Sequence, residues 1–335
     1  MKILFYGGCH ATVLKKAFEE YSLGDHEFDV ITNYVLIAKK ELFPYEIISK
    51  YDYIVFNPIF NKGDWNTVHI ENYCLSTNTK VLKYPWMQWG GYWIDAKQRL
   101  WGGSKEWGSS YVNSLADKYP DINEYHQAVQ SQSEAGVFAH KWIDKTTSFL
   151  QRNEINGNCD FVYSDWIHDN YSKEKLFLTP DHPSTFTYKK LITDISSSLG
   201  IDLNLTFYDI NHEFQSGVYS PIIGGVKSAL KLEFVSDLWA HKEIWRGKSF
   251  DVKYYIDSYH KAGNVYSCKA KCNTFIKNSD GSKLRIRSKT SILIIKCDFS
   301  DIKHHYKVKV VDDHGNMNDA YLYRPHWDLL AAINK

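Results

Sequence analysis

Short apolar runs alternate with amphipathic stretches through the first two hundred residues. Residues 2–6 form an apolar run that ends at a glycine pair, and residues 11–21 carry apolar side chains at helical spacing. Runs rich in branched and aromatic residues predict further strands at 28–31, 53–56, 81–84 and 176–178. Helices are expected between them at 34–50, 109–151 and 158–171. This alternation predicts an α/β fold, a mostly parallel sheet with helices on both faces.

After residue 183 the sequence predicts one more helix, and the pattern then changes to alternating polar and apolar residues. A final helix is expected over 184–198, because Ser184 offers an N-cap and Gly200 a stop. Alternating polar and apolar residues then predict antiparallel strands at 250–255, 266–276, 284–296 and 306–311, with turns at 278–281 and 312–315. We therefore expect an α/β catalytic domain over 1–205 and a β-rich C-terminal domain or extension over 206–335, joined through 220–225.

Cys9 follows the first predicted strand and precedes the first predicted helix. Unpaired backbone N–H groups and the positive end of the helix dipole meet at such a junction. Both favour the thiolate, so the sequence predicts a lowered pKa for Cys9 and a nucleophilic role. Gly7 and Gly8 allow a substrate to approach the backbone closely. The alternative is a small buried cysteine without chemistry.

His182 lies at a second junction between a predicted strand and a helix. Pro180 and Pro183 flank it and restrict where its imidazole points. If strand 176–178 lies in the same parallel sheet as strand 2–6, the imidazole and the Cys9 thiol meet at one sheet edge. A histidine next to a thiol is the arrangement that nucleophilic catalysis needs. The alternative is a histidine that only caps the helix.

Composition limits the classes of function. Of the 335 residues, 44% are hydrophobic and 24% charged, which is ordinary for a globular protein, whereas the aromatic share of 16% is high. Aromatic residues often stack on sugar rings, although a Tyr-rich core explains the same number. The net charge of +1 gives no sign of a nucleic-acid partner. Residues 226–335 carry 20 Lys and Arg against 12 Asp and Glu, which suits phosphates, an anionic polysaccharide, a membrane surface or merely a solvated face.

Targeting and metal signals are absent from the sequence pattern. The first residues lack a signal-peptide cleavage pattern, and no apolar stretch has the length of a transmembrane segment. The six cysteines lack disulfide-like spacing, so a cytoplasmic protein with reduced thiols is expected. Cys268 and Cys272 do not match the spacing of a zinc site, so we expect no metal.

Three sequence blocks, in order, resemble a known family. Residues 5–10 (FYGGCH) resemble the GNCQ opening of the WcbI-type polysaccharide-biosynthesis acetyltransferases. Residues 85–93 (PWMQWGGYW) resemble the middle block of that family, and residues 170–184 its closing LF.T..HP block. The resemblance covers roughly residues 1 to 200.

The resemblance implies an SGNH-hydrolase-like, flavodoxin-like α/β fold and coenzyme A binding. It also implies transfer of an acetyl group from acetyl-coenzyme A to a sugar hydroxyl of a capsule or exopolysaccharide, so the expected partner is a carbohydrate acceptor. The usual serine of such folds is replaced by a cysteine paired with the closing histidine. Carried over to this sequence, the catalytic pair is Cys9 and His182.

Two departures from the family pattern matter. Gly8 and His10 replace the asparagine and glutamine that flank the cysteine, so any oxyanion contact that those side chains make needs another donor, and backbone N–H groups at Gly8 can serve. His10 is either a second imidazole near the thiol or a helix N-terminal residue. Thr179 stands three positions before His182, where related folds carry an acid, and Asp181 is adjacent to His182. Adjacent loop residues seldom point together, so the sequence favours a Cys–His dyad, or a carbonyl that orients the imidazole, over an orienting role for Asp181.

Other binding residues are expected at strand ends and glycine turns. Asn57 follows the strand 53–56 and is a candidate oxyanion donor or an ordinary Asn-Pro turn residue. Gly90, Gly91 and Tyr92 either shape an acyl-donor pocket or form a turn among aromatic neighbours.

Three functions follow from these residues. The first is an acetyl-coenzyme A-dependent O-acetyltransferase that uses Cys9 and His182. The second is a thiol esterase or deacetylase on the same fold, in which water replaces the sugar. The third is a non-catalytic carbohydrate-binding or assembly protein that uses the β-rich part and a tryptophan cluster, namely Trp86, Trp89, Trp93, Trp101 and Trp107.

Overall fold

The computed structural model describes residues 1–101, 104–215, 217–241, 249–253 and 255–256, followed by seven strands between residues 266 and 332. The chain forms two compact units, and each unit is made from two stretches of sequence. The first unit contains Met1–Trp89 and Ile143–Ser216, and the second contains Gly90–Trp142 and Gly217–Lys335. Because each unit combines two separate stretches of sequence, no single boundary along the chain divides them. The boundary near residue 205 stays a prediction.

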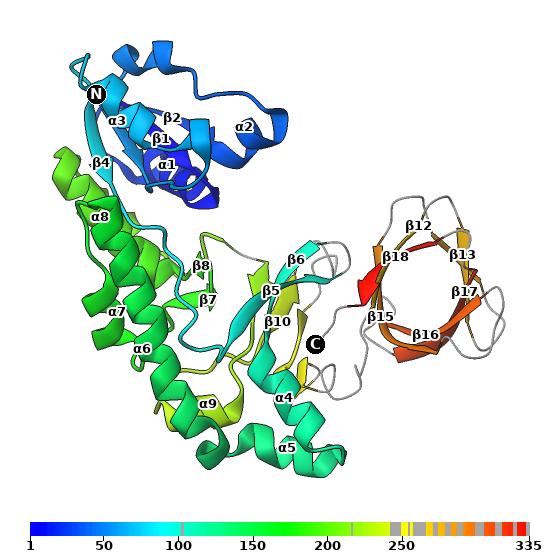
Figure 1. The fold of residues 1–335 in the computed structure, drawn as a ribbon. Coiled ribbons are helices and arrows are strands. Elements are labelled where there is room, and N and C mark those ends of the chain that lie inside the picture. The colour runs from blue at the N-terminus through cyan, green and yellow to red at the C-terminus, as the bar shows by residue number, and fades with distance from the viewer. Residues whose placement is uncertain are drawn as a thin grey trace. The chain divides into compact units, whose positions relative to one another are not determined.

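A four-stranded parallel sheet forms the centre of the first unit (Figure 1). Its strands are β1 (Lys2–Gly7), β2 (Glu27–Thr32), β3 (Tyr53–Phe56) and β4 (Lys80–Lys83), in the order β2-β1-β3-β4. Tyr6 pairs with Ile31 on one side and Phe56 on the other, so the carboxyl ends of β1, β2 and β3 reach the same edge. The first four predicted strands are confirmed.

Helices cover both faces of this sheet because side chains of a strand alternate between the faces. On one face, Phe5 packs against Phe18 of α1 (Cys9–Tyr21), with ring centroids 5.4 Å apart, and α1 contacts α8 (Thr185–Leu199). On the other face, Leu4 and Tyr6 join a buried cluster with side chains from η1 (Tyr45–Lys50) and α3 (Val68–Cys74). The predicted α/β class is confirmed.

The predicted helix 34–50 is wrong, because a short α-helix and a 3₁₀ helix take its place with a break between them. Helix α2 (Asn33–Lys39) ends at Lys40, whose φ of 58° is left-handed, and η1 begins only after Pro44. Proline has no backbone N–H to continue a helix, and its ring disfavours helical geometry in the preceding residue. The apolar periodicity on either side of this break gave the appearance of one helix.

The predicted helix 109–151 is three helices, and the predicted helix 158–171 is shorter. Ser109 and Asp121 accept backbone N–H bonds as N-caps, and each begins a new helix. The carboxylate of the buried Glu154 accepts from the first backbone N–H groups of the shorter helix. The observed helices are α4 (Ser110–Lys118), α5 (Ile122–Gln130), α6 (Gln132–Gly157) and α7 (Ser164–Asn170).

The predicted strand 176–178 does not join the parallel sheet. Strand β7 (Phe177–Thr179) instead pairs antiparallel with β8 (His182–Pro183) in a two-stranded sheet. Helix α8 follows directly, with its N-cap at Ser184 and a left-handed Gly200 (φ 68°) as its C-cap, as predicted. His182 therefore lies on a tight hairpin that leads into α8.

The second unit contains two small antiparallel sheets and a helix. They are β5 (Ala96–Trp101) with β6 (Ser104–Ser109), and β9 (Val218–Tyr219) with β10 (Trp239–His241) and β11 (Ser249–Phe250). Helix α9 (Gly224–Ala229) begins within the predicted connector 220–225. A Cβ at Gly225 would lie 2.7 Å from the Ser131 carbonyl oxygen, so this segment is tightly packed and is not a linker.

Seven antiparallel strands follow, in the order β14-β13-β17-β16-β15-β12-β18. The predicted antiparallel character is confirmed, but strand 250–255 is not, because Val252, Lys253 and Tyr255 are helical. The predicted turns 278–281 and 312–315 lie almost wholly outside the described residues, as does Cys272. The strands are β12 (Tyr266–Ala270), β13 (Thr274–Asn278), β14 (Lys283–Ile286), β15 (Ser291–Asp298), β16 (His305–Val311), β17 (Met317–Tyr323) and β18 (Trp327–Ala332).

Short 3₁₀ turns complete the first unit at η2 (Gly63–Trp65) and η3 (Leu205–Phe207). Among the helices of the described residues, none has the length and apolar character that a membrane crossing requires.

Candidate active site

Cys9 is the first residue of α1, directly after Gly8 as the N-cap, and it lines a pocket of about 190 Å³. Helix α1 contributes Cys9, Thr12, Val13 and Lys16 at spacings of three and four, which places them on one helical face. Tyr34 of α2 and the segment Phe214–Gln215 complete the lining. The pocket thus combines a thiol, apolar surface and one exposed cation.

The environment of the Cys9 thiol raises its pKa. Burial is the largest cause, and the nearby Asp181 carboxylate adds to the rise. A hydrogen bond from the Gln215 side chain and the backbone N–H groups of Cys9 and His10 act in the opposite direction but do not outweigh burial. The predicted lowering of this pKa is therefore wrong, because burial of the thiol disfavours the charged thiolate by more than the helix N-terminus favours it.

His182 is held by two neighbours on its own hairpin. Its Nδ1 lies 2.7 Å from Thr179 Oγ1 and 3.0 Å from Asp181 Oδ1. The Thr179 hydroxyl donates to the same Asp181 oxygen at 2.9 Å. Since that hydroxyl hydrogen is used, Nδ1 must carry the proton it shares with these oxygens, and Nε2 keeps its lone pair. The hairpin thus holds His182 through Nδ1, and Nε2 of the neutral ring is left as an acceptor.

The sequence favoured other groups over Asp181 as the partner of His182, but the structure places the Asp181 carboxylate against the imidazole. Residues 179 and 182 pair across the β7–β8 hairpin, and the turn between them directs the Asp181 carboxylate back toward the imidazole. Thr179 bridges the carboxylate to the ring. This contact depends on the geometry of the tight turn, which the sequence spacing alone does not reveal.

The structure brings the loops of Cys9 and His182 together but does not join the two side chains. In the described part of the chain, the hydrogen-bond partners of the thiol are Gln215 and backbone N–H groups, and the His182 imidazole is not among them. The link between the loops runs through their neighbours, because His10 Nε2 lies 3.1 Å from the Asp181 carbonyl oxygen. His10 is wholly buried, so its side chain has no open surface for substrate.

Asn57 lies beside the carboxyl end of β1, as its position after β3 predicted. It is 2% exposed, and its Oδ1 is buried without a hydrogen-bond partner among the described residues. A Cβ at Gly7 would lie 2.6 Å from this oxygen, so only glycine allows the approach. A Cβ at Gly8 would lie 3.2 Å from the Trp86 ring, which shows that an indole covers the turn before Cys9. Oxyanion binding by Asn57 and Gly8 stays a prediction.

Several polar residues around Cys9 were not predicted from the sequence. Gln215 comes from a loop far along the chain, and its Oε1 accepts from the Tyr188 hydroxyl at 2.8 Å. Tyr84 is fully buried, and within the described part of the chain its hydroxyl has no hydrogen-bond partner. Tyr84 follows β4 as Asn57 follows β3, so its place at a strand end was a usable signal. Gln215 carried no such signal.

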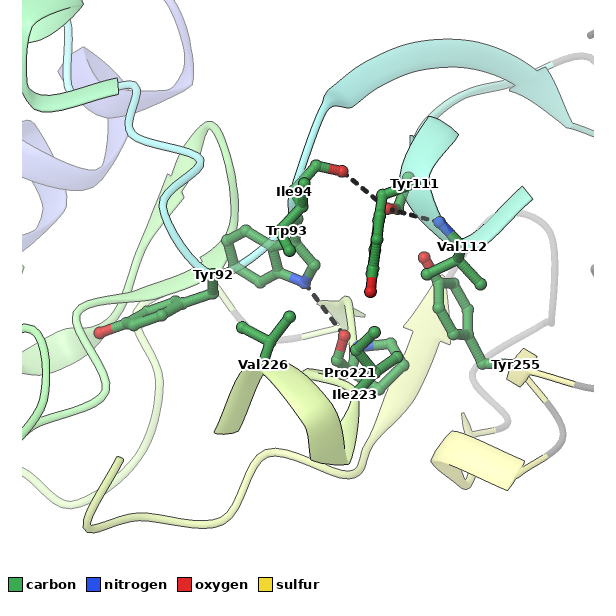
Figure 2. A pocket seen from close by; sticks show the side chains of 10 residues that line it. Tyr92, Trp93, Ile94, Tyr111, Val112, Pro221, Ile223, Val226 and Tyr255 are labelled. Carbon is green, nitrogen blue, oxygen red and sulfur yellow. Dashed lines mark hydrogen bonds between the residues drawn. The ribbon is translucent and has the colours of Figure 1, made fainter. Parts of the chain in front are cut away.

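Gly90, Gly91 and Tyr92 belong to the second unit, so their predicted role as donor-binding residues stays a prediction. They form a turn in which the Gly90 carbonyl accepts from the Trp93 backbone N–H and from Trp142 Nε1, both at 2.9 Å. Tyr92 also lines an aromatic cavity of about 10 Å³ (Figure 2). Such a volume holds about one water molecule, so this cavity is not a substrate pocket.

No group of three or more His, Cys, Asp or Glu residues that could hold a metal ion occurs within the described residues.

Comparison with known proteins identifies the family. Residues 2–204 match the family model described as polysaccharide biosynthesis enzyme WcbI. A solved structure of WcbI, reported as a novel polysaccharide biosynthesis enzyme in its native form without a disulfide bond between coenzyme A and a cysteine, is similar in fold. It has a TM-score of 0.60 and 14% sequence identity, over 78% of this chain and 88% of that one. No curated protein matches the chain. Since the family model covers more than half of the sequence, the chain belongs to the WcbI family of polysaccharide biosynthesis enzymes.

Proposed function

We propose that this enzyme transfers an acetyl group from acetyl-coenzyme A to a sugar hydroxyl during capsule or exopolysaccharide synthesis. The observation that carries the proposal is the pocket in which Cys9 opens beside the oriented His182 hairpin. Acetyl-coenzyme A is available in the cytoplasm, where we therefore place the reaction. The coenzyme A named with the similar WcbI structure supports the choice of donor.

The pocket beside Cys9 has the chemistry that a thioester donor needs. Val13 and Phe214 offer apolar surface to a pantetheine arm, and Lys16 offers a cation to a phosphate. Lys16 is seven residues beyond Cys9 on α1, which is about 10 Å along the helix. A donor lying along α1 thus contacts the thiol and the cation at separate points.

The proposed reaction has two transfers. His182 Nε2 takes the Cys9 proton, the sulfur bonds to the acetyl carbon, and the bond from that carbon to the coenzyme A sulfur breaks. His182 then returns the proton to the departing thiolate. In the second transfer the sugar oxygen attacks the acetyl-cysteine, His182 takes the hydroxyl proton, and the Cys9 sulfur leaves with that proton.

The raised pKa of Cys9 fits this scheme. A thiol that stays protonated until a base reaches it needs His182, and Asp181 stabilises the imidazolium formed at that moment. In this step the His182 ring has to move into contact with the sulfur, because that hydrogen bond is not formed in the structure. Backbone N–H groups at the start of α1 are the candidates for binding the oxyanion.

The test is transfer of isotopically labelled acetyl from acetyl-coenzyme A to a panel of neutral mono- and oligosaccharides, with products read by mass spectrometry. We expect labelled sugar with the wild type, and none with Cys9→Ala or His182→Ala. Cys159→Ala is the matched control, because Cys159 is also a partly exposed free cysteine and contributes nothing to the pocket lining. Unchanged transfer by Cys9→Ala, or no acetyl-coenzyme A binding by calorimetry, contradicts the proposal.

A further inference from the structure

We propose that His10 is a positioning residue, which holds the His182 hairpin at the start of α1 by donating a hydrogen bond to the Asp181 carbonyl. The kinetic part of this inference rests on the proposed acetyl transfer, whereas its structural part does not. His10 immediately follows Cys9, and Asp181 immediately precedes His182. The bond therefore joins the neighbours of both proposed catalytic residues.

The chemistry of the contact fixes the state of the His10 ring. Nε2 faces a carbonyl oxygen at 3.1 Å, so Nε2 must carry a proton and donate it. Nδ1 is buried, and none of the residues that the structure describes offers it a hydrogen bond, so it carries no proton. A neutral imidazole of one tautomer is the only form that suits this site.

Packing fixes the direction of the ring. Trp86 lies against one side, with ring centroids 4.7 Å apart and planes inclined by 33°, and Tyr188 meets the ring edge-on at 6.1 Å. His10 is fully buried between them. The donor therefore points at the Asp181 carbonyl without freedom to turn elsewhere, which is what a rigid support for a hairpin requires.

The Asp181 peptide is a sensitive place for such a support. Its carboxylate and the Thr179 hydroxyl hold His182 Nδ1, so a displacement of residue 181 moves the imidazole directly. The hairpin has a second anchor, because the Trp89 backbone N–H donates to the Pro180 carbonyl at 2.7 Å. Loss of the His10 bond is therefore expected to shift the hairpin rather than to unfold it.

Two substitutions at His10 separate the hydrogen bond from the packing. His10→Phe keeps an aromatic ring but removes the donor, whereas His10→Gln offers an amide N–H of similar reach. Thr79→Val is a matched structural control, because buried Thr79 Oγ1 donates to the Ile48 and Tyr51 carbonyls just before β4 begins. That contact lies at the opposite end of the strand from the site.

The readouts are kcat, KM for acetyl-coenzyme A, and backbone hydrogen exchange of residues 177–183. For His10→Phe we expect kcat to fall by about tenfold with KM unchanged, and hairpin exchange to rise by about tenfold, the size of one lost hydrogen bond. His10→Gln is expected to restore both toward wild type, and Thr79→Val to leave both unchanged.

Wild-type kcat and wild-type exchange in His10→Phe would overturn the proposal, as would equal effects of Phe and Gln. Faster exchange in His10→Phe that His10→Gln reverses supports it even without a measured reaction. Failure of the wild type to transfer acetyl contradicts the proposed function, while the exchange measurement still decides the role of His10.

Discussion

Lowering the pH places a proton on His10 in the unfolded chain before it does so in the folded one. Burial lowers the pKa of His10 to about 4, against a reference of 6.5. Between these values the unfolded state binds more protons than the folded state, so the free energy of unfolding falls as the pH falls. The difference of about 2.5 between the two pKa values corresponds to a total decrease of about 3 kcal/mol in the free energy of unfolding. About 2 kcal/mol of this decrease occurs between pH 7 and pH 4.5.

The assay is urea unfolding of the wild type and His10→Gln at several pH values in that window. Glutamine does not titrate, so the stability of the wild type relative to His10→Gln is expected to decline by about 2 kcal/mol on acidification. Glu134 also has a lowered pKa, through hydrogen bonds from Tyr119 and Lys118. Its reference value is 4.5, so the stability that it contributes is lost only below the window.

A stability difference between wild type and His10→Gln that stays constant from pH 7 to pH 4.5 would refute this reasoning. Such a result means that water reaches the His10 ring, or that the ring is not held against the Asp181 carbonyl.

Three other outcomes follow from the site. Gly7→Ala should cost about 1–3 kcal/mol in chemical unfolding, because the added methyl meets Asn57 Oδ1 at 2.6 Å, and equal stability contradicts the close approach. Gln215→Leu removes a hydrogen bond that lowers the pKa of Cys9, so the midpoint of iodoacetamide labelling against pH should rise, and an unchanged midpoint speaks against that bond. Lys16→Ala should weaken coenzyme A binding by about three- to tenfold in calorimetry, and unaltered affinity removes Lys16 from the donor site.

Much of the fold was predictable because apolar runs and caps are local features. The strands that became β1 to β4 were found from their apolar runs, and α8 from Ser184 and Gly200. The predicted helix 34–50 was wrong because its apolar periodicity continues past Pro44, a residue that interrupts helices. Strand 176–178 was found as a strand but given the wrong partner, because pairing depends on the tertiary position of a segment rather than on its own composition.

Candidate site residues could be predicted from the sequence where a reactive or polar side chain lies directly after a strand or just before a helix. Cys9 and Asn57 follow strands, and His182 precedes a helix, so each stood out in the sequence. The pKa of Cys9 was mispredicted because a helix N-terminus is visible in sequence, whereas burial of the thiol is not. The Asp181 contact to His182 and the arrival of Gln215 depend on turn geometry and on a distant loop, which local pattern does not encode.

The most direct test is peptide mass spectrometry of the protein after rapid acid quenching of a mixture with acetyl-coenzyme A and no sugar. The account predicts one acetyl group on the peptide that contains Cys9, and none on that peptide in His182→Ala at the same time point. Labelled sugar product formed without any acetyl on Cys9, or equal acetylation in His182→Ala, would contradict it.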